Sequence, residues 1–131
     1  RMPLLFSRAM TTDGLDLNQV VAVSATNPAK IYGLYPRKGT IGIGSDADFA
    51  VWDPDRKMKI SIDGLHDGMD YTPYDGLDVQ GWPVVTVSRG EVIWRDGKFT
   101  GEAGRGEFLP CDRPNPINDQ SFLDDTGVPQ V

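Results

Sequence analysis

Asp46 and Asp48 stand one residue apart and form an acidic pair whose spacing could support chemistry. In extended backbone, residues i and i+2 point to the same side, so both carboxylates could face one cation or one proton donor. Aspartates also shape turns, because their side chains accept hydrogen bonds from nearby backbone N–H groups. No other ligand lies near the pair in the sequence, so we interpret both as turn and strand-entry residues.

His66 and Cys111 are the single histidine and the single cysteine of the chain. A catalytic metal site normally needs three or more well-placed ligands, often with histidine among them. We therefore interpret His66, in a loop rich in glycine and aspartate, as a surface or hydrogen-bonded residue. Cys111 lies far along the chain between prolines, so a Cys/His nucleophilic pair has almost no support.

A glycine-rich segment at 39–44 and four aromatic residues complete the candidates. The segment lacks dinucleotide-binding spacing, a preceding strand and a following helix, so its glycines indicate tight turns rather than a phosphate site. Aromatic residues could form a ligand platform, although in a small β-domain they are more often core or interface anchors. The four are Tyr71, Tyr74, Trp82 and Trp94. We predict no catalytic, cofactor-binding or metal-ligating residue in this chain.

Length and composition place the chain among single domains or pieces of larger ones, at 131 residues. A formal net charge of −6 disfavours nucleic acid and anionic membranes as partners. One cysteine fits a reducing compartment, so we expect a cytoplasmic protein. No apolar run approaches the ~20 residues that span a bilayer. The 15 glycines and 10 prolines predict many turns and short strands.

The first predicted helix covers residues 17–24. Asp16 followed by Gln19 fits a capping box at its start, after a turn at Asp13-Gly14. The run from 20 to 23 is β-branched and apolar nearly all round, so a strand is a competing interpretation. If the segment is a helix, it should be buried on more than one side.

A second short helix is predicted directly afterwards. Thr26 or Asn27 can cap it, with Pro28 in the first turn, where a missing N–H costs nothing. Gly33 suits the left-handed position at its end, and Pro36 prevents any continuation.

From residue 39 onward the apolar pattern changes to a period of two, which predicts a small antiparallel sheet. The expected strands are 49–52, 57–62, 83–88, 91–95 and 98–99, with turns at Arg89-Gly90 and Asp96-Gly97. The side chains expected to face inward are Met58, Ile60, Ile62, Val85, Val87, Val92 and Trp94. A long loop is expected from 63 to 81, and an extended or disordered tail after residue 101.

Three motifs carry a family resemblance. Gly-Ser-Asp-Ala-Asp at 44–48 contains the Gly-x-x-Ala-Asp element that occurs across amidohydrolases, whereas Tyr-Pro-Arg-Lys-Gly at 35–39 and Asp-Tyr-Thr-Pro-Tyr at 70–74 are narrower. With them the chain resembles the dihydropyrimidinase and hydantoinase family, the cyclic-amide branch of the metal-dependent amidohydrolases. The resemblance runs from residue 1 to about residue 112.

The resemblance implies a larger enzyme than this chain alone. The family has a (β/α)8 barrel, with its sites at the C-terminal ends of the strands, and a β-sandwich built from both chain ends. Its members use two divalent metals, usually zinc, bridged by a carboxylated lysine, and the metals activate the water that attacks the ring amide. None of the family's metal ligands has a counterpart in this chain, so we expect it to bind no metal itself.

We therefore predict an α+β C-terminal segment of such a hydrolase, structural and inactive alone. Residues 1–38 would be the terminal helical part of the barrel, 39–109 the C-terminal part of the β-sandwich, and 110–131 an extended tail. The expected partners are the N-terminal remainder of the enzyme and further copies, through the β-domain and the tail. The alternative is a free-standing, non-catalytic β-module that self-associates.

Overall fold

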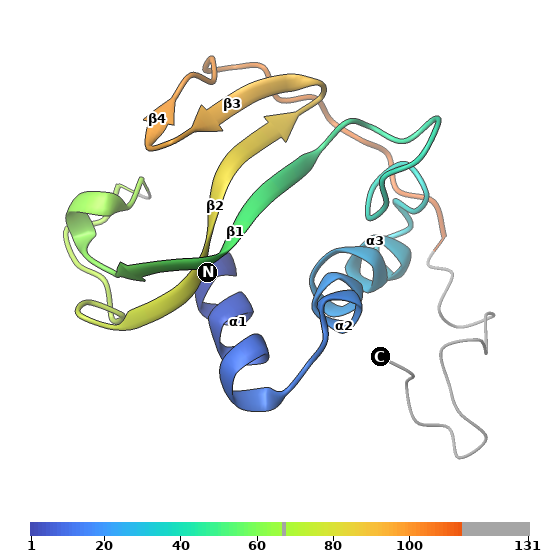
Figure 1. Ribbon diagram of the computed structural model, residues 1–131. Coiled ribbons are helices and arrows are strands. Elements are labelled where there is room, and N and C mark those ends of the chain that lie inside the picture. The colour runs from blue at the N-terminus through green and yellow to red at the C-terminus, as the bar shows by residue number, and fades with distance from the viewer. Residues whose placement is uncertain (67, 114–131) are drawn as a thin grey trace.

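Figure 1 shows the computed structural model of the chain, which describes residues 1–66 and 68–113. Helices form the N-terminal part, and a strongly twisted antiparallel sheet follows. Its four strands lie in the order β1-β2-β3-β4, so each strand pairs with the next one along the chain. The expected class of short helices followed by a small antiparallel sheet is confirmed at this level.

Helix α1 (Met2–Arg8) was not predicted and opens the fold. It continues into a π-helical turn at Ala9–Asp13 and ends where Gly14 adopts the left-handed conformation, at φ 67°. Pro3 lies in its first turn, where the missing N–H costs nothing. Phe6 and Ala9, three residues apart, supply its buried face. The apolar residues of α1 are present in the sequence, but the stretch is too short to indicate a helix by itself.

The second helical stretch runs without a break from α2 (Leu17–Val21) through a π-helical turn at Ala22–Thr26 into α3 (Asn27–Ile31). Its predicted capping box is confirmed. The Gln19 amide donates to Asp16 Oδ1 at 2.9 Å, and the Asp16 amide donates to Gln19 Oε1 at 2.9 Å. The strand interpretation of residues 20–23 is wrong, because this cap commits the segment to a helix.

The predicted cap of a separate second helix is also wrong. Thr26 is helical, with φ −68° and ψ −51°, and makes no capping bond. Its hydroxyl donates instead to the Gly39 carbonyl oxygen at 2.7 Å, which fastens the following loop to the helix. The predicted end is confirmed, since Gly33 is left-handed at φ 65°.

β1 (Phe49–Lys59) joins the two predicted strands 49–52 and 57–62 and ends at Lys59, so the prediction of strand at 60–62 is wrong. β2 (Asp78–Ser88) is longer than the predicted 83–88. Asp53-Pro54 does not end β1, because an irregularity in its register with β2 between Asp53 and Lys57 accommodates the proline. β2 starts at Asp78, so the loop before it is shorter than expected. Pro83 lies within β2, opposite Trp52 at a second register shift.

The remaining strands, β3 (Glu91–Arg95) and β4 (Lys98–Phe99), follow two tight turns that were predicted. Arg89 and Gly90 have φ of 50° and 81°, and Asp96 and Gly97 have φ of 47° and 86°. Positive φ at both central residues is the type I′ geometry, whose twist matches that of the flanking strands.

The core is small and lies where α1 packs on the sheet. Phe6, Ala9 and Val20 form its buried cluster. The ring of Phe6 stacks on that of Trp52, with 4.8 Å between the ring centroids and an interplanar angle of 16°. Gly81 of β2 makes this approach possible, because a Cβ there would lie 2.3 Å from the Phe6 ring.

Further buried side chains are Val79 and Val87 of β2 and Ile60, which directly follows β1. Ile60 and Val87 were expected to face inward, and the other expected residues are half-buried except Val92. Val92 is 38% exposed, because α1 covers β2 while β3 lies beyond the helix (Figure 1). Among the described residues, no helix is long and apolar enough to cross a membrane.

Candidate functional site

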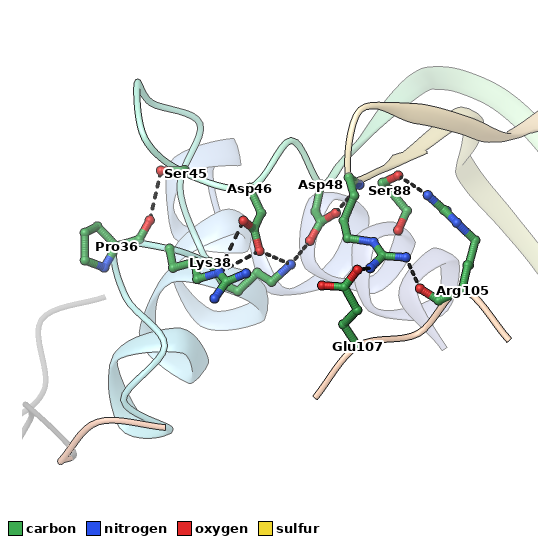
Figure 2. Close-up of polar contacts among 10 residues, drawn as sticks. Pro36, Lys38, Ser45, Asp46, Asp48, Ser88, Arg105 and Glu107 are labelled. Carbon is green, nitrogen blue, oxygen red and sulfur yellow. Dashed lines mark hydrogen bonds and ion pairs between the residues drawn. The ribbon is translucent and has the colours of Figure 1, made fainter. Parts of the chain in front are cut away.

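Asp46 and Asp48 do face one partner, as their spacing allows, and that partner is Lys38 (Figure 2). Lys38 Nζ lies 2.8 Å from Asp46 Oδ2 and also donates to Asp48 Oδ2. Arg37 Nε adds two contacts to the Asp46 carboxylate, at 3.0 and 3.2 Å. We call these four residues the Lys38 ion cluster.

A closed loop between α3 and β1 brings the cluster together. The Ser45 hydroxyl donates to the Pro36 carbonyl oxygen at 2.9 Å, and the Asp46 amide donates to the Arg37 carbonyl oxygen at 3.0 Å. Gly44, at φ 92°, lets the chain reverse between these bonds. The loop therefore returns its acidic end to its basic beginning.

The charges of the cluster shift its pKa values. Burial alone would lower the pKa of Lys38, but the hydrogen bonds that its ammonium group donates to both aspartates outweigh burial and raise that pKa. The hydrogen bond from Lys38 is the main cause that lowers the pKa of Asp46. Burial acts to raise the pKa of Asp48, and the bonds from Lys38 and from the Arg89 amide more than reverse this. All three groups are held in their charged forms.

The cluster is also joined to the turn between β2 and β3. Asp48 Oδ1 accepts a 2.6 Å bond from the Arg89 amide, and the Gly90 amide donates to the Ala47 carbonyl oxygen at 3.0 Å. The interpretation of Asp48 as a strand-entry residue thus captures its backbone contact, just before β1. That interpretation did not identify Lys38 as a partner, although the basic residues at 37–38 have the charge that complements the acidic pair.

His66 and Cys111 lie on different parts of the fold. His66 is exposed, and its ring meets that of Trp94 edge-on at 5.1 Å and 69°. Cys111 is exposed and precedes Asp112, whose amide donates to the Gly33 carbonyl oxygen just after α3.

The four candidate aromatics are divided between two cavities rather than gathered in one platform. Tyr71, Tyr74 and Trp82 line a cavity of about 310 Å³ beside the start of α1. Trp82 and Trp94 line another, of about 350 Å³, together with His66. Trp82 lies between the two.

The glycine-rich segment forms turns, as interpreted from the sequence. Gly39, at φ 81°, packs so closely on α3 that a Cβ there would lie 2.5 Å from Ala29 Cβ. Ile41 and Ile43 are almost fully exposed, at 83% and 111%. A loop that presents isoleucines to solvent does not resemble a phosphate cradle.

The described residues of the chain do not fit the two-metal centre that the resemblance implies. Within 1–66 and 68–113, no three His, Cys, Asp or Glu side chains gather in a way that could hold a metal ion. The carboxylates of Asp46 and Asp48 already face a lysine ammonium group, which occupies the position of a cation. The cluster can hold a loop in place, and it offers no open ligand set.

Comparison with known proteins decides the family. The sequence profile described as Amidohydrolase family matches residues 2–93. The chain belongs to this family. D-phenylhydantoinase from Escherichia coli O1:K1 / APEC is 46% identical over 109 residues, which are 83% of this chain and 24% of that protein. Dihydropyrimidinase from Rattus norvegicus is 41% identical over 110 residues, 84% of this chain and 21% of that protein.

Solved structures agree with the sequence comparison for this amidohydrolase-family chain. Dihydropyrimidinase from Brevibacillus agri NCHU1002 superposes with a TM-score of 0.83 and 38% identity, covering 88% of this chain and 25% of that one. L-hydantoinase from Arthrobacter aurescens gives a TM-score of 0.76 and 37% identity, covering 81% and 24%. The resemblance to dihydropyrimidinases and hydantoinases is confirmed. The chain spans about a quarter of the length of the relatives it matches.

Proposed function

We propose that this chain is the C-terminal structural part of a dihydropyrimidinase- or hydantoinase-type hydrolase, an enzyme that opens cyclic amides such as hydantoins and dihydropyrimidines. One observation carries the proposal: relatives of this type match most of the chain, while the chain spans only about a quarter of their length. The metal-activated water that attacks the ring amide belongs to the rest of such an enzyme. This part supplies structure.

An exposed apolar helix face supports the proposal. Leu17 and Val21 on α2 are 55% and 54% exposed, and Ile31 on α3 is 50% exposed. Apolar side chains exposed together on one element mark an interface in a soluble protein. In the proposed enzyme this face packs on the barrel, and residues 17–31 belong to its last helical layer.

The sheet offers a second open surface. β1 is 11 residues long and lies at the edge of the sheet, with only β2 beside it among the described strands. A long edge strand leaves unpaired N–H and C=O groups that another strand can complete. In the proposed enzyme the sheet is part of a β-sandwich whose other strands come from the N-terminal end.

Mass and complementation test the proposal together. The native protein, purified from its source, should have an intact mass well above the 14.4 kDa of this chain, or should hold the chain with a larger partner. Expressed with the upstream part of the same protein, the chain should restore opening of hydantoin or dihydrouracil. The chain alone should show no turnover. Turnover by the chain alone that survives repurification and is abolished by a chelator would contradict the proposal.

The second candidate function is a free-standing, non-catalytic β-module that self-associates. The open edge of β1 favours it, because two copies could pair edge to edge. Sedimentation and denaturant unfolding of the chain alone distinguish the two. A monodisperse oligomer that unfolds cooperatively favours the module, whereas aggregation relieved by the upstream part favours the hydrolase.

A further inference from the structure

The segment that follows β4 runs back across the molecule. In Figure 1 it is the orange trace that leaves the sheet, passes the loop before β1 and reaches α3. Its side chains contribute little to the core, since Glu107 and Phe108 are exposed, the latter at 90%. Both of its ends are nevertheless fastened by bonds to other elements. We call residues 105–112 the strap.

Two arginines fasten the strap to the sheet in a reciprocal arrangement (Figure 2). Arg89, in the turn between β2 and β3, donates through Nη2 to the Arg105 carbonyl oxygen, and its Nη1 lies 2.6 Å from Glu107 Oε1. Arg105 reaches back from the strap and donates to the Ser88 carbonyl oxygen at 2.9 Å. Arg105 Nη2 also lies 2.9 Å from Glu91 Oε2. Each arginine therefore binds one backbone carbonyl and one carboxylate, which makes use of its several donors.

The far end of the strap is fastened just beyond α3. The Asp112 amide donates to the Gly33 carbonyl oxygen at 2.9 Å. The two backbones are so close that a Cβ on Gly33 would lie 2.0 Å from the Asp112 carbonyl oxygen. Between the two ends, Leu109 is half-buried and lines a cavity of about 200 Å³ beside the Lys38 ion cluster.

The strap ties together two parts that share little packing. Of the described helices, α1 is the one that packs on β2, while α2 joins the core through Val20. The end of α3 is connected to the sheet by the loop that carries the Lys38 ion cluster and by the strap. Both connections meet at Arg89, whose amide binds Asp48 and whose guanidinium binds the strap.

We propose that the strap is a conformational device that fixes the orientation of the sheet relative to the helical stretch 17–31, with Arg89 as its latch. The latch works from the turn between β2 and β3, where one residue holds two chain segments. Releasing either end of the strap leaves the loop that carries the Lys38 ion cluster as the remaining connection to the end of α3, so the sheet gains freedom to rotate about the α1 contact. The proposal does not depend on cyclic-amide hydrolysis, because no step of it involves substrate.

Amide hydrogen exchange on the full 131-residue chain tests the proposal. The Asp112 amide reports the far end of the strap, and the amide of Val87, within β2, reports the integrity of the sheet. Arg89→Met removes the latch, and Gly33→Ala places a methyl group against the Asp112 backbone. Each change should speed Asp112 exchange by roughly tenfold, the effect of losing a hydrogen-bonded closure, and leave Val87 protected.

The chain offers matched controls for both substitutions. Arg95→Met removes the same charge from an exposed residue of β3. Gly14→Ala alters a left-handed glycine at a helix end, φ 67°, where a Cβ would meet no atom within 4 Å. Both controls should leave Asp112 exchange within about twofold of the unaltered chain.

Each outcome decides the matter. Asp112 protection in the unaltered chain that is lost in Arg89→Met and Gly33→Ala and kept in the controls supports the strap. Fast Asp112 exchange in the unaltered chain overturns it, and so does protection that neither variant reduces.

If Arg89→Met also exposes Val87, Arg89→Lys decides, because one ammonium keeps the charge but not the paired contacts of the guanidinium. It should speed Asp112 exchange while Val87 stays protected, and unchanged Asp112 exchange overturns the strap. Turnover is not measured, so either proposal can fail without the other.

Discussion

At the scale of single residues, Lys38 offsets the repulsion between the carboxylates of the acidic pair. Its side chain is only 23% exposed and lies between two carboxylates that would otherwise repel each other. Lys38→Met should therefore lower the free energy of unfolding by about 1 kcal/mol, the upper end for partly exposed ion pairs. Urea unfolding measures it, with Lys57→Met, at an exposed position of β1, as the control. Equal losses in the two variants would show that the cluster adds nothing to stability.

Asp48 should give the fold a measurable dependence on acid. Lys38 and the Arg89 amide hold the pKa of the folded Asp48 below its usual 3.8, against the opposing effect of burial. The unfolded chain therefore binds the proton more readily, so the stability from Asp48 is complete above about pH 5 and is lost as the pH falls through the folded pKa.

The matching experiment compares the unaltered chain with Asp48→Asn across pH. The difference in free energy of unfolding should be largest near neutral pH and shrink below about pH 4, where Asp48 itself becomes uncharged. A difference that stays constant into acid would mean that the charge of Asp48 does not contribute. Asp75→Asn, at an exposed loop position, should show no such trend.

Sequence reasoning reaches part of this site. The spacing of Asp46 and Asp48 allows a shared partner, because alternate residues of an extended chain face one side, although turn and strand entry is the interpretation preferred from the sequence. It does not identify that partner, since Lys38 reaches them only when the intervening loop closes on itself. The contact between Asp48 and Arg89 is even harder to predict from the sequence, because it requires the turn between β2 and β3 to fold against the loop. Contacts between distant segments carry no local signal.

At the scale of elements, Gly81 decides how closely α1 can approach β2. A methyl group there would lie 2.3 Å from the Phe6 ring, in the core. Gly81→Ala should therefore cost about 2 kcal/mol or more in free energy of unfolding, because the core cannot absorb the added volume. Gly76→Ala is the control, since Gly76 has a similar φ of 80° but no atom within 4 Å of the added Cβ. If both variants lose the same stability, backbone strain alone explains the effect.

Elements with strong local signals could be predicted, and those that depend on packing could not. The capping box at Asp16 and the two type I′ turns are specified by neighbouring residues, so the sequence predicts them. Helix α1 is short and gains its stability from burying Phe6 against Trp52, a contact between segments distant in the chain. Likewise Pro54 signals a strand end, but the pairing of β1 with β2 continues past it.

At the scale of the whole molecule, polar contacts hold segments of the chain together, while several apolar side chains stay exposed. The Lys38 ion cluster and the strap join segments within the chain, and all their partners are described residues. Three apolar side chains of α2 and α3, those of Leu17, Val21 and Ile31, contribute little to the core, since each is at least half exposed. In the proposed enzyme, these exposed apolar side chains pack against the upstream part.

Val21 allows this packing to be tested against its buried neighbour. Val21→Lys should change the free energy of unfolding of the isolated chain by no more than about 0.5 kcal/mol, because the side chain is 54% exposed. In the complex with the upstream part, the same lysine would lose its solvation inside an apolar interface, so association should weaken by tenfold or more, roughly. Val20→Lys is the contrasting variant: Val20 is 6% exposed, so it should unfold the isolated chain itself. Titration calorimetry and urea unfolding measure the two effects, and unchanged association of Val21→Lys would remove the helix face from the proposed interface.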